Sequence, residues 1–95
     1  MSEAKIVIDG REISSSQPPY IIAELSANHN GKLETALKII DEAVEAGADA
    51  VKLQTYRPDT ITLNSDADDF KIKGGLWDGR TLYELYEEAH MPWEW

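Results

Sequence analysis

Three polar side chains stand near the ends of two apolar runs, the position at which parallel α/β enzymes bind their ligands. Glu24 lies one residue before the end of the run at residues 20–25. Lys52 and Gln54 lie two residues apart in the run at 50–55, so in a strand both project from one face. A lysine and an amide there could supply a positive charge and hydrogen-bond donors to a carboxylate or phosphate. The alternatives are that Lys52 extends to water from an edge strand and that Glu24 only caps the nearby turn.

The turn directly after Glu24 contains Asn28 and His29. A neutral imidazole at this place could orient Glu24 or donate to a sugar hydroxyl, and the alternative is a purely structural histidine. The chain contains no GxGxxG or Walker sequence. The acidic stretch at residues 66–69 lacks the glycine and the final glutamate of a calcium loop, so we interpret it as a solvated turn.

The elements that must position these side chains follow from the hydrophobic pattern. Two β-prone segments flank an Asp-Gly turn at residues 9–10, which predicts a β-hairpin, and residues 15–19 form a connector. The runs at 20–25 and 50–55 are nearly continuous in apolar residues, as is typical of strands buried on both faces. Residues 32–46 carry apolar side chains at helical spacing, which predicts a helix that crosses between two parallel strands.

The remaining sequence predicts a long connection and one more helix. Residues 56–79 are polar and interrupted by proline and glycine, and connections of this length are more often functional than idle. Residues 81–90 show a helical pattern that Pro92 ends. Trp93 and Trp95 then follow with no predicted partner.

We therefore expect an α/β fold with an N-terminal β-hairpin and the first βα units of a (β/α)8 TIM barrel, which remains incomplete. Residues 1–19 would be the hairpin and connector. Residues 20–95 would be a partial barrel domain, truncated at its C-terminus, because a lone pair of parallel strands leaves open edges and bare faces.

The composition excludes several classes of function. The 95 residues include 18 acidic and 9 basic side chains, a formal charge of −9, so we expect no nucleic acid and no anionic membrane as partner. The absence of cysteine excludes disulfides, thiolate metal sites and cysteine nucleophiles. The N-terminus shows no signal peptide and no apolar stretch is long enough for a membrane span, which favours a cytoplasmic location.

Two segments carry a family resemblance. IAELSANHNG at residues 22–31 and GADAVKLQT at residues 47–55 resemble the N-terminal barrel signature of the sialic acid synthase family. The serine and alanine after Glu24-Leu25, together with FKIKGGLW at residues 70–77, are most similar to the pseudaminic acid synthase branch. The resemblance covers the chain from residue 20 onward, which would be only part of a family member.

The resemblance implies a reaction and roles for the matching residues. The family condenses phosphoenolpyruvate with an amino sugar, here a 2,4-diacetamido-trideoxy hexose, giving a nine-carbon 2-keto acid and phosphate. Glu24 would be the catalytic acid near the reacting carbons, and Lys52 and Gln54 would bind phosphoenolpyruvate. Asn28 and His29 would belong to the substrate-binding residues.

The same resemblance implies a metal ion and a second subunit for the full-length enzyme. A divalent metal, Mn²⁺ or Mg²⁺, would polarise the sugar aldehyde in the full-length enzyme, with its ligands beyond Trp95 and none within this chain. The full-length enzyme would be a homodimer, and the 95 residues alone would be inactive. Two alternatives stay open: a segment of an N-acetylneuraminate or legionaminate synthase, and a non-catalytic truncated module that oligomerises.

Overall fold

The computed structural model describes residues 4–95; residues 1–3, on which the signal-peptide prediction partly rests, lie outside the described residues. The helices and strands are β1 (Lys5–Ile8), β2 (Arg11–Ser14), β3 (Ile22–Glu24), α1 (Leu33–Glu45), β4 (Ala50–Lys52) and α2 (Leu82–Ala89). Two short 3-10 turns, Pro58–Thr60 and Asp68–Phe70, lie between β4 and α2. Within residues 4–95, β1 pairs with β2 and β3 pairs with β4, so two separate two-stranded sheets form.

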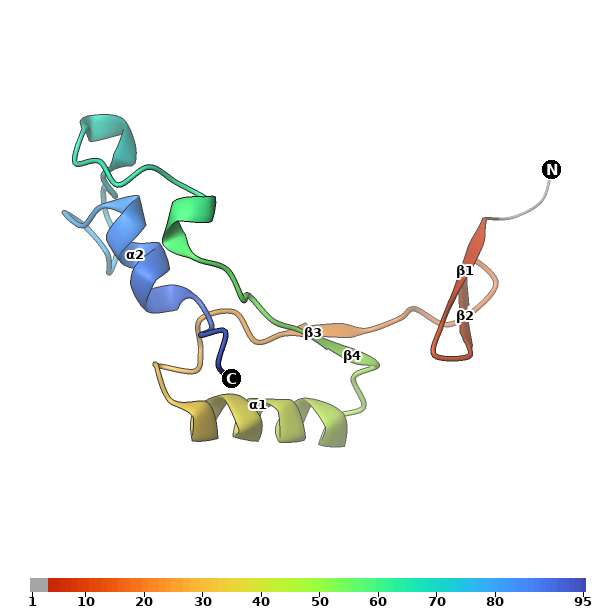
Figure 1. Cartoon of the computed structure of the whole chain (residues 1–95). Helices are drawn as coiled ribbons and strands as arrows, with labels where there is room; N and C mark the ends of the chain where they lie inside the picture. Colours follow the sequence, from red (N-terminus) through yellow and green to blue (C-terminus); the bar gives the residue numbers. More distant parts are fainter. Residues whose placement is uncertain (1–3) are drawn as a thin grey trace.

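The predicted N-terminal hairpin is confirmed. β1 and β2 are antiparallel, with Ile8 opposite Arg11 at the turn. Asp9 and Gly10 both have positive φ, 50° and 78°, which a two-residue turn of this twist requires. The hairpin stands apart from the helices and reaches β3 through an extended connector (Figure 1).

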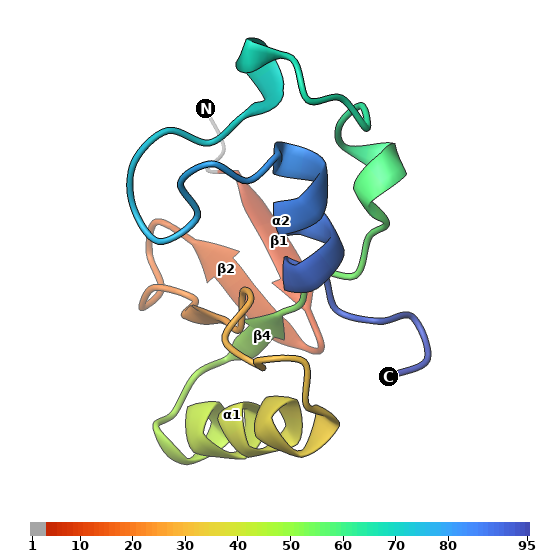
Figure 2. The same ribbon diagram turned by 90° about the vertical axis from the view of Figure 1, so that its left-hand side faces the viewer.

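The predicted strand–helix–strand unit is also confirmed, although its strands are shorter than the apolar runs. β3 and β4 are parallel and have three residues each. The helix α1 lies on one side of this strand pair in both views (Figures 1 and 2). Gly47 follows α1 with a φ of 92°, the left-handed conformation in which glycine commonly ends a helix.

A small apolar core joins α1 to the two strands. Its members are the buried Leu25, Ala36 and Met91, with the partly buried Ile39, Ile40 and Val51 packed against them. The prediction that the strands are buried on both faces is wrong for this structure. Because α1 packs on the face that carries Val51, Ile22 and Glu24 of β3 lie on the opposite face and are exposed.

The helix predicted at residues 81–90 is confirmed as α2, with Thr81 and His90 as its capping residues. The hydroxyl oxygen of Thr81 accepts from the backbone N–H of Glu84 at 3.1 Å, and the Glu84 carboxylate accepts from the Thr81 N–H at 3.2 Å. This reciprocal capping box fixes the start of α2. Figure 1 places α2 beyond the carboxyl ends of β3 and β4, where the candidate site lies.

Trp95 has a partner that the sequence does not predict. Its ring meets the ring of His29 edge-on, with centroids 5.2 Å apart and planes at 81°. Trp93 is exposed, as expected. The expectation that both tryptophans lack a partner is therefore wrong for Trp95, because the tail after α2 returns to the turn after β3.

Candidate functional site

Glu24 and Lys52 lie directly opposite each other at the carboxyl ends of β3 and β4. The Lys52 Nζ is 3.3 Å from the Glu24 Oε1, so the two side chains form an ion pair. Residues that are paired across adjacent strands project from the same face. That face is the one opposite α1, since Val51, the neighbour of Lys52, packs in the core.

The Glu24–Lys52 pair is open to solvent. The Glu24 side chain is 60% exposed and the Lys52 side chain 57% exposed. Ion pairs with this exposure contribute little to stability, about 0–1 kcal/mol. An ammonium has three N–H donors, so Lys52 can keep its contact with Glu24 and still donate to an anion. The arrangement is suited to bind an anionic ligand next to a carboxylate.

Gln54 lies outside β4, which ends at Lys52, so the prediction that both belong to one regular strand is wrong. The ladder stops because β3 also ends, at Glu24, and the chain beyond is held by other contacts. The backbone carbonyl of Gln54 accepts from the N–H of Met91 at 2.8 Å. The half-buried Gln54 is thereby fixed to the segment that follows α2.

Asn28 holds the turn after β3. Its side-chain Nδ2 donates to the carbonyl of Leu25 at 3.0 Å, and its backbone N–H donates to the same oxygen at 3.2 Å. Leu25 is in turn fully buried, and its N–H donates to the carbonyl of Lys52 at 3.2 Å. Asn28 therefore supports the residue next to Glu24, and its predicted contact with substrate stays a prediction.

His29 is buried, with 1% of its surface exposed. Its Nδ1 accepts from the N–H of Gly31 at 2.8 Å, and its Nε2 lies 3.2 Å from the carbonyl oxygen of Ala89. Both ring nitrogens are thus used within the protein. The structure joins His29 to α2, and a direct contact with substrate stays a prediction.

The contact between Asp49 and Arg11 was missed by the sequence reasoning; it lies at the amino ends of the two parallel strands, opposite the end that carries Glu24 and Lys52. Asp49, directly before β4, accepts from the N–H of Ile21 at 2.8 Å and forms an ion pair with Arg11 of the hairpin. No local pattern links two residues this far apart. The only available signal is an unpaired arginine after a turn and an aspartate at the start of an apolar run.

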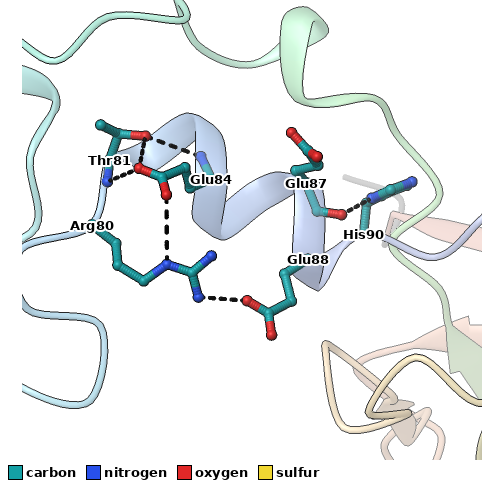
Figure 3. Close-up of polar contacts among 6 residues, drawn as sticks. All are labelled: Arg80, Thr81, Glu84, Glu87, Glu88 and His90. Carbon is teal, nitrogen blue, oxygen red and sulfur yellow. Dashed lines mark hydrogen bonds and ion pairs between the residues drawn. The ribbon is translucent and has the colours of Figure 1, made fainter.

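A second charged cluster lies on α2 and is shown in Figure 3. Arg80 approaches Glu88 at 2.6 Å and Glu84 at 3.9 Å, and its guanidinium lies 4.9 Å from the centre of the Trp77 ring. An open hollow of about 540 Å³ is lined by Arg80, Glu84, Glu87 and Glu88. Arg80 pairs with the carboxylates of Glu84 and Glu88, so we interpret this cluster as part of the helix surface.

The described residues do not fit a metal centre. Within residues 4–95, no three histidine or acidic side chains converge closely enough to hold a metal ion. We therefore assign no metal ligand and no metal-dependent step to this part of the chain. Within the same range, no helix combines the length and apolar character that crossing a membrane requires.

A parallel strand–helix–strand unit whose strands both end in charged side chains defines the chain as an α/β segment. The particular family follows from comparison with known sequences. The chain belongs to the NeuB family, whose sequence profile matches residues 39–95.

Within this family, the chain is similar to several synthases of known name. The chain is 70% identical to the pseudaminic acid synthase of Campylobacter jejuni over 76 residues, which are 80% of this chain and 22% of that enzyme. It is 57% identical to the pseudaminic acid synthase of Helicobacter pylori over 79 residues, 83% of this chain and 23% of the relative. It is 36% identical to the N,N'-diacetyllegionaminic acid synthase of Legionella pneumophila over 80 residues, 84% of this chain and 22% of the relative. The match thus spans less than a quarter of the length of these three relatives.

Proposed function

We propose that this chain is the N-terminal part of a synthase that condenses phosphoenolpyruvate with a 2,4-diacetamido-trideoxy hexose to give pseudaminic acid and phosphate. The observation that carries the proposal is the pairing of Glu24 with Lys52 on the open face at the carboxyl ends of β3 and β4. The names of the relatives at 70% and 57% identity support the choice of sugar. In this proposal the full-length fold is a TIM barrel with residues 1–19 as a separate hairpin and connector.

The proposed roles follow from charge and position. Lys52 neutralises an anionic group of phosphoenolpyruvate, and Gln54 adds amide donors from the chain beyond β4. Glu24 lies next to this anion site and faces the reacting carbons and the sugar. Asn28 and His29, in the turn after β3, belong to the substrate-binding side of the same pocket.

The proposed chemistry is a balanced addition. The enol carbon of phosphoenolpyruvate attacks the aldehyde carbon of the open-chain sugar and forms the new C–C bond. Water adds to the neighbouring carbon, and one of its protons goes to the former aldehyde oxygen, which becomes a hydroxyl. The bond from that carbon to the phosphate oxygen then breaks, so phosphate leaves with the electron pair and the second proton, and the carbon becomes the ketone. Lys52 holds the anionic substrate in place through these steps, and a fixed ammonium next to developing negative charge favours them.

We further propose that residues 1–95 alone are inactive. Glu24 and Lys52 are more than half exposed, and a ligand pocket needs walls that converge on the ligand. The expected result is no phosphate release when the isolated chain is mixed with phosphoenolpyruvate, Mn²⁺ and the amino sugar. A cytoplasmic location and a homodimeric full-length enzyme stay predictions.

A non-catalytic module is the alternative of a different class. Its support is the hairpin, where Ile6, Val7 and Ile8 are all exposed and could pair with a second copy. Sedimentation of the isolated chain separates the two proposals. A discrete oligomer would favour the module, whereas aggregation or an expanded monomer would favour a segment of a larger enzyme.

Two chimeric enzymes test the proposed function. In the first, this chain replaces the matching segment of the Campylobacter jejuni pseudaminic acid synthase; in the second, it replaces that of the Legionella pneumophila synthase. We expect the first chimera to keep its condensation activity and the second to lose most of it, because identity falls from 70% to 36%. Activity in the second chimera alone would assign the chain to a legionaminate synthase instead, and inactivity of both would contradict the proposal.

A further inference from the structure

The segment after α2 contacts the carboxyl ends of both parallel strands. The carbonyl of Ala89 lies 3.2 Å from the Nε2 of His29, which follows β3. Two residues later, the N–H of Met91 donates to the carbonyl of Gln54, which follows β4, at 2.8 Å. Figure 1 shows this tail passing from α2 back toward the strand ends. One short stretch of backbone therefore touches the chain on both sides of the candidate site.

The bonds of His29 define its protonation pattern. The N–H of Gly31 donates to Nδ1, so Nδ1 carries no proton. The proton of the neutral ring is then on Nε2, which donates it to the Ala89 carbonyl. His29 is 1% exposed, and the ring of Trp95 lies nearly perpendicular to the imidazole with the ring centres 5.2 Å apart. His29 thus has one acceptor bond within its own turn and one donor bond to α2.

The turn that His29 anchors is continuous with Glu24. Leu25 follows Glu24, is fully buried, and donates its N–H to Lys52. Its carbonyl accepts both from the backbone and from the side chain of Asn28, the neighbour of His29. A shift of His29 would therefore reach the backbone beside Glu24 through two residues, each held by hydrogen bonds.

We infer that His29 is a positioning residue: through its Nε2–H bond to Ala89 it ties the end of β3 to the segment that also holds Gln54, and so fixes Glu24 relative to Gln54. The inference rests on the proposed function for its kinetic test. This role replaces the substrate contact proposed above for His29, because both ring nitrogens bond to the protein. Small displacements of catalytic groups are costly, with losses of roughly 100-fold in rate for a shift of about 1 Å.

Two conservative substitutions separate the two bonds of His29. Glutamine places its amide nitrogen near the position of Nε2, so His29→Gln can keep the bond to Ala89. Asparagine places its amide oxygen near the position of Nδ1, so His29→Asn can keep only the bond to Gly31. His29→Ala removes both bonds. The matched control is Glu42→Gln, because the exposed Glu42 lies on α1, outside both the turn after β3 and the segment after α2.

The experiment uses the Campylobacter jejuni chimera and measures kcat, the KM of each substrate and the thermal midpoint. We expect His29→Asn and His29→Ala to lower kcat by roughly 10- to 100-fold with little change in either KM. His29→Gln should recover most of this loss, and the control should match the unsubstituted chimera. A raised KM for the sugar that glutamine does not restore would overturn the inference in favour of direct substrate binding. An unchanged kcat with only a lower thermal midpoint would overturn it in favour of a purely structural histidine.

Nitrogen NMR of the imidazole tests the hydrogen bond from His29 to Ala89 independently of activity. We expect the unsubstituted chimera to show His29 with a protonated Nε2 and an unprotonated Nδ1. A proton on Nδ1 would overturn the inference even if the enzyme is active. If the unsubstituted chimera makes no product, the proposed function fails by itself, and the NMR result still decides whether the bond to Ala89 exists.

Discussion

The guanidinium of Arg11 and the carboxylate of Asp49 form an ion pair across 38 positions of the chain. Arg11 also donates to the carbonyls of Pro18 and Pro19, at 3.5 and 3.2 Å, and its guanidinium lies 5.3 Å from the centre of the Tyr20 ring. Asp49 meanwhile holds the N–H of Ile21. The pair therefore joins the hairpin, its connector and the beginnings of both parallel strands.

Replacing Arg11 with lysine should loosen this junction. We expect Arg11→Lys to lower the free energy of unfolding by about 1 kcal/mol, because a single ammonium cannot reproduce a planar fork of donors stacked on a ring. Denaturant unfolding of the Campylobacter jejuni chimera measures the change. Arg57→Lys is the control, since Arg57 pairs only locally with the exposed Asp59. Equal losses in the free energy of unfolding for the two substitutions would show that Arg11 stabilises the fold no more than a locally paired surface arginine does.

The capping box of α2 predicts a pH dependence (Figure 3). Hydrogen bonds from the backbone and side chain of Thr81 hold the pKa of the Glu84 carboxyl below its ordinary value of 4.5, with Arg80 adding to this effect. A lowered pKa means that the charged form stabilises the fold. This contribution is complete above the ordinary pKa and is lost as the pH falls through the lowered one.

We therefore expect Glu84→Gln to remove part of the acid sensitivity of the chimera below about pH 5. Thermal midpoints measured from pH 7 down to pH 3 test this. Glu87→Gln is the control, because that side chain lies on the same helix outside the capping box. Thr81→Ala should lower stability by about 1 kcal/mol at neutral pH, as the loss of an N-cap does. Identical pH profiles for Glu84→Gln and the unsubstituted protein would contradict this assignment.

The phenol of Tyr56 should ionise at a higher pH than that of an ordinary tyrosine. Burial raises the pKa of its phenol above the ordinary value of 10.0, and the neighbouring Tyr86 raises it further. The two rings are 5.8 Å apart and nearly perpendicular. An ultraviolet difference titration between the chimera and its Tyr56→Phe variant isolates this group. Tyr86→Phe should bring the pKa only part of the way back, since burial is the larger cause; a return to the ordinary value would reverse that order.

The sequence predicts the parts of this structure that depend on local pattern. The Asp-Gly hairpin turn and the apolar spacing of α1 are both encoded within a few residues, and each is found where expected. The placement of Glu24 and Lys52 at the carboxyl ends of two parallel strands was also predicted, whereas their ion pair was not.

Long-range contacts could not be predicted in the same way. The bond from His29 to Ala89 joins positions 60 residues apart, and the Arg11–Asp49 pair joins positions 38 apart. Neither has a periodic signature in the chain. The strands were expected to be buried on both faces because their residues are apolar. Apolar composition alone does not determine whether one face or both faces of a strand pack against other elements. Gln54 was misplaced because the apolar run continues past the end of the ladder.

The most direct test of the central claim is the dependence of the chimera's initial rate on phosphoenolpyruvate concentration, with Lys52→Met as the variant. Lys38→Met, which removes a charge from α1 away from the strand ends, is the control. If Lys52 binds phosphoenolpyruvate, Lys52→Met lowers kcat/KM for it by about 10- to 100-fold, the loss expected for one charge-assisted hydrogen bond, and the control does not. An unchanged kcat/KM for Lys52→Met would show that the Glu24–Lys52 pair is a surface ion pair and that the proposed site is wrong.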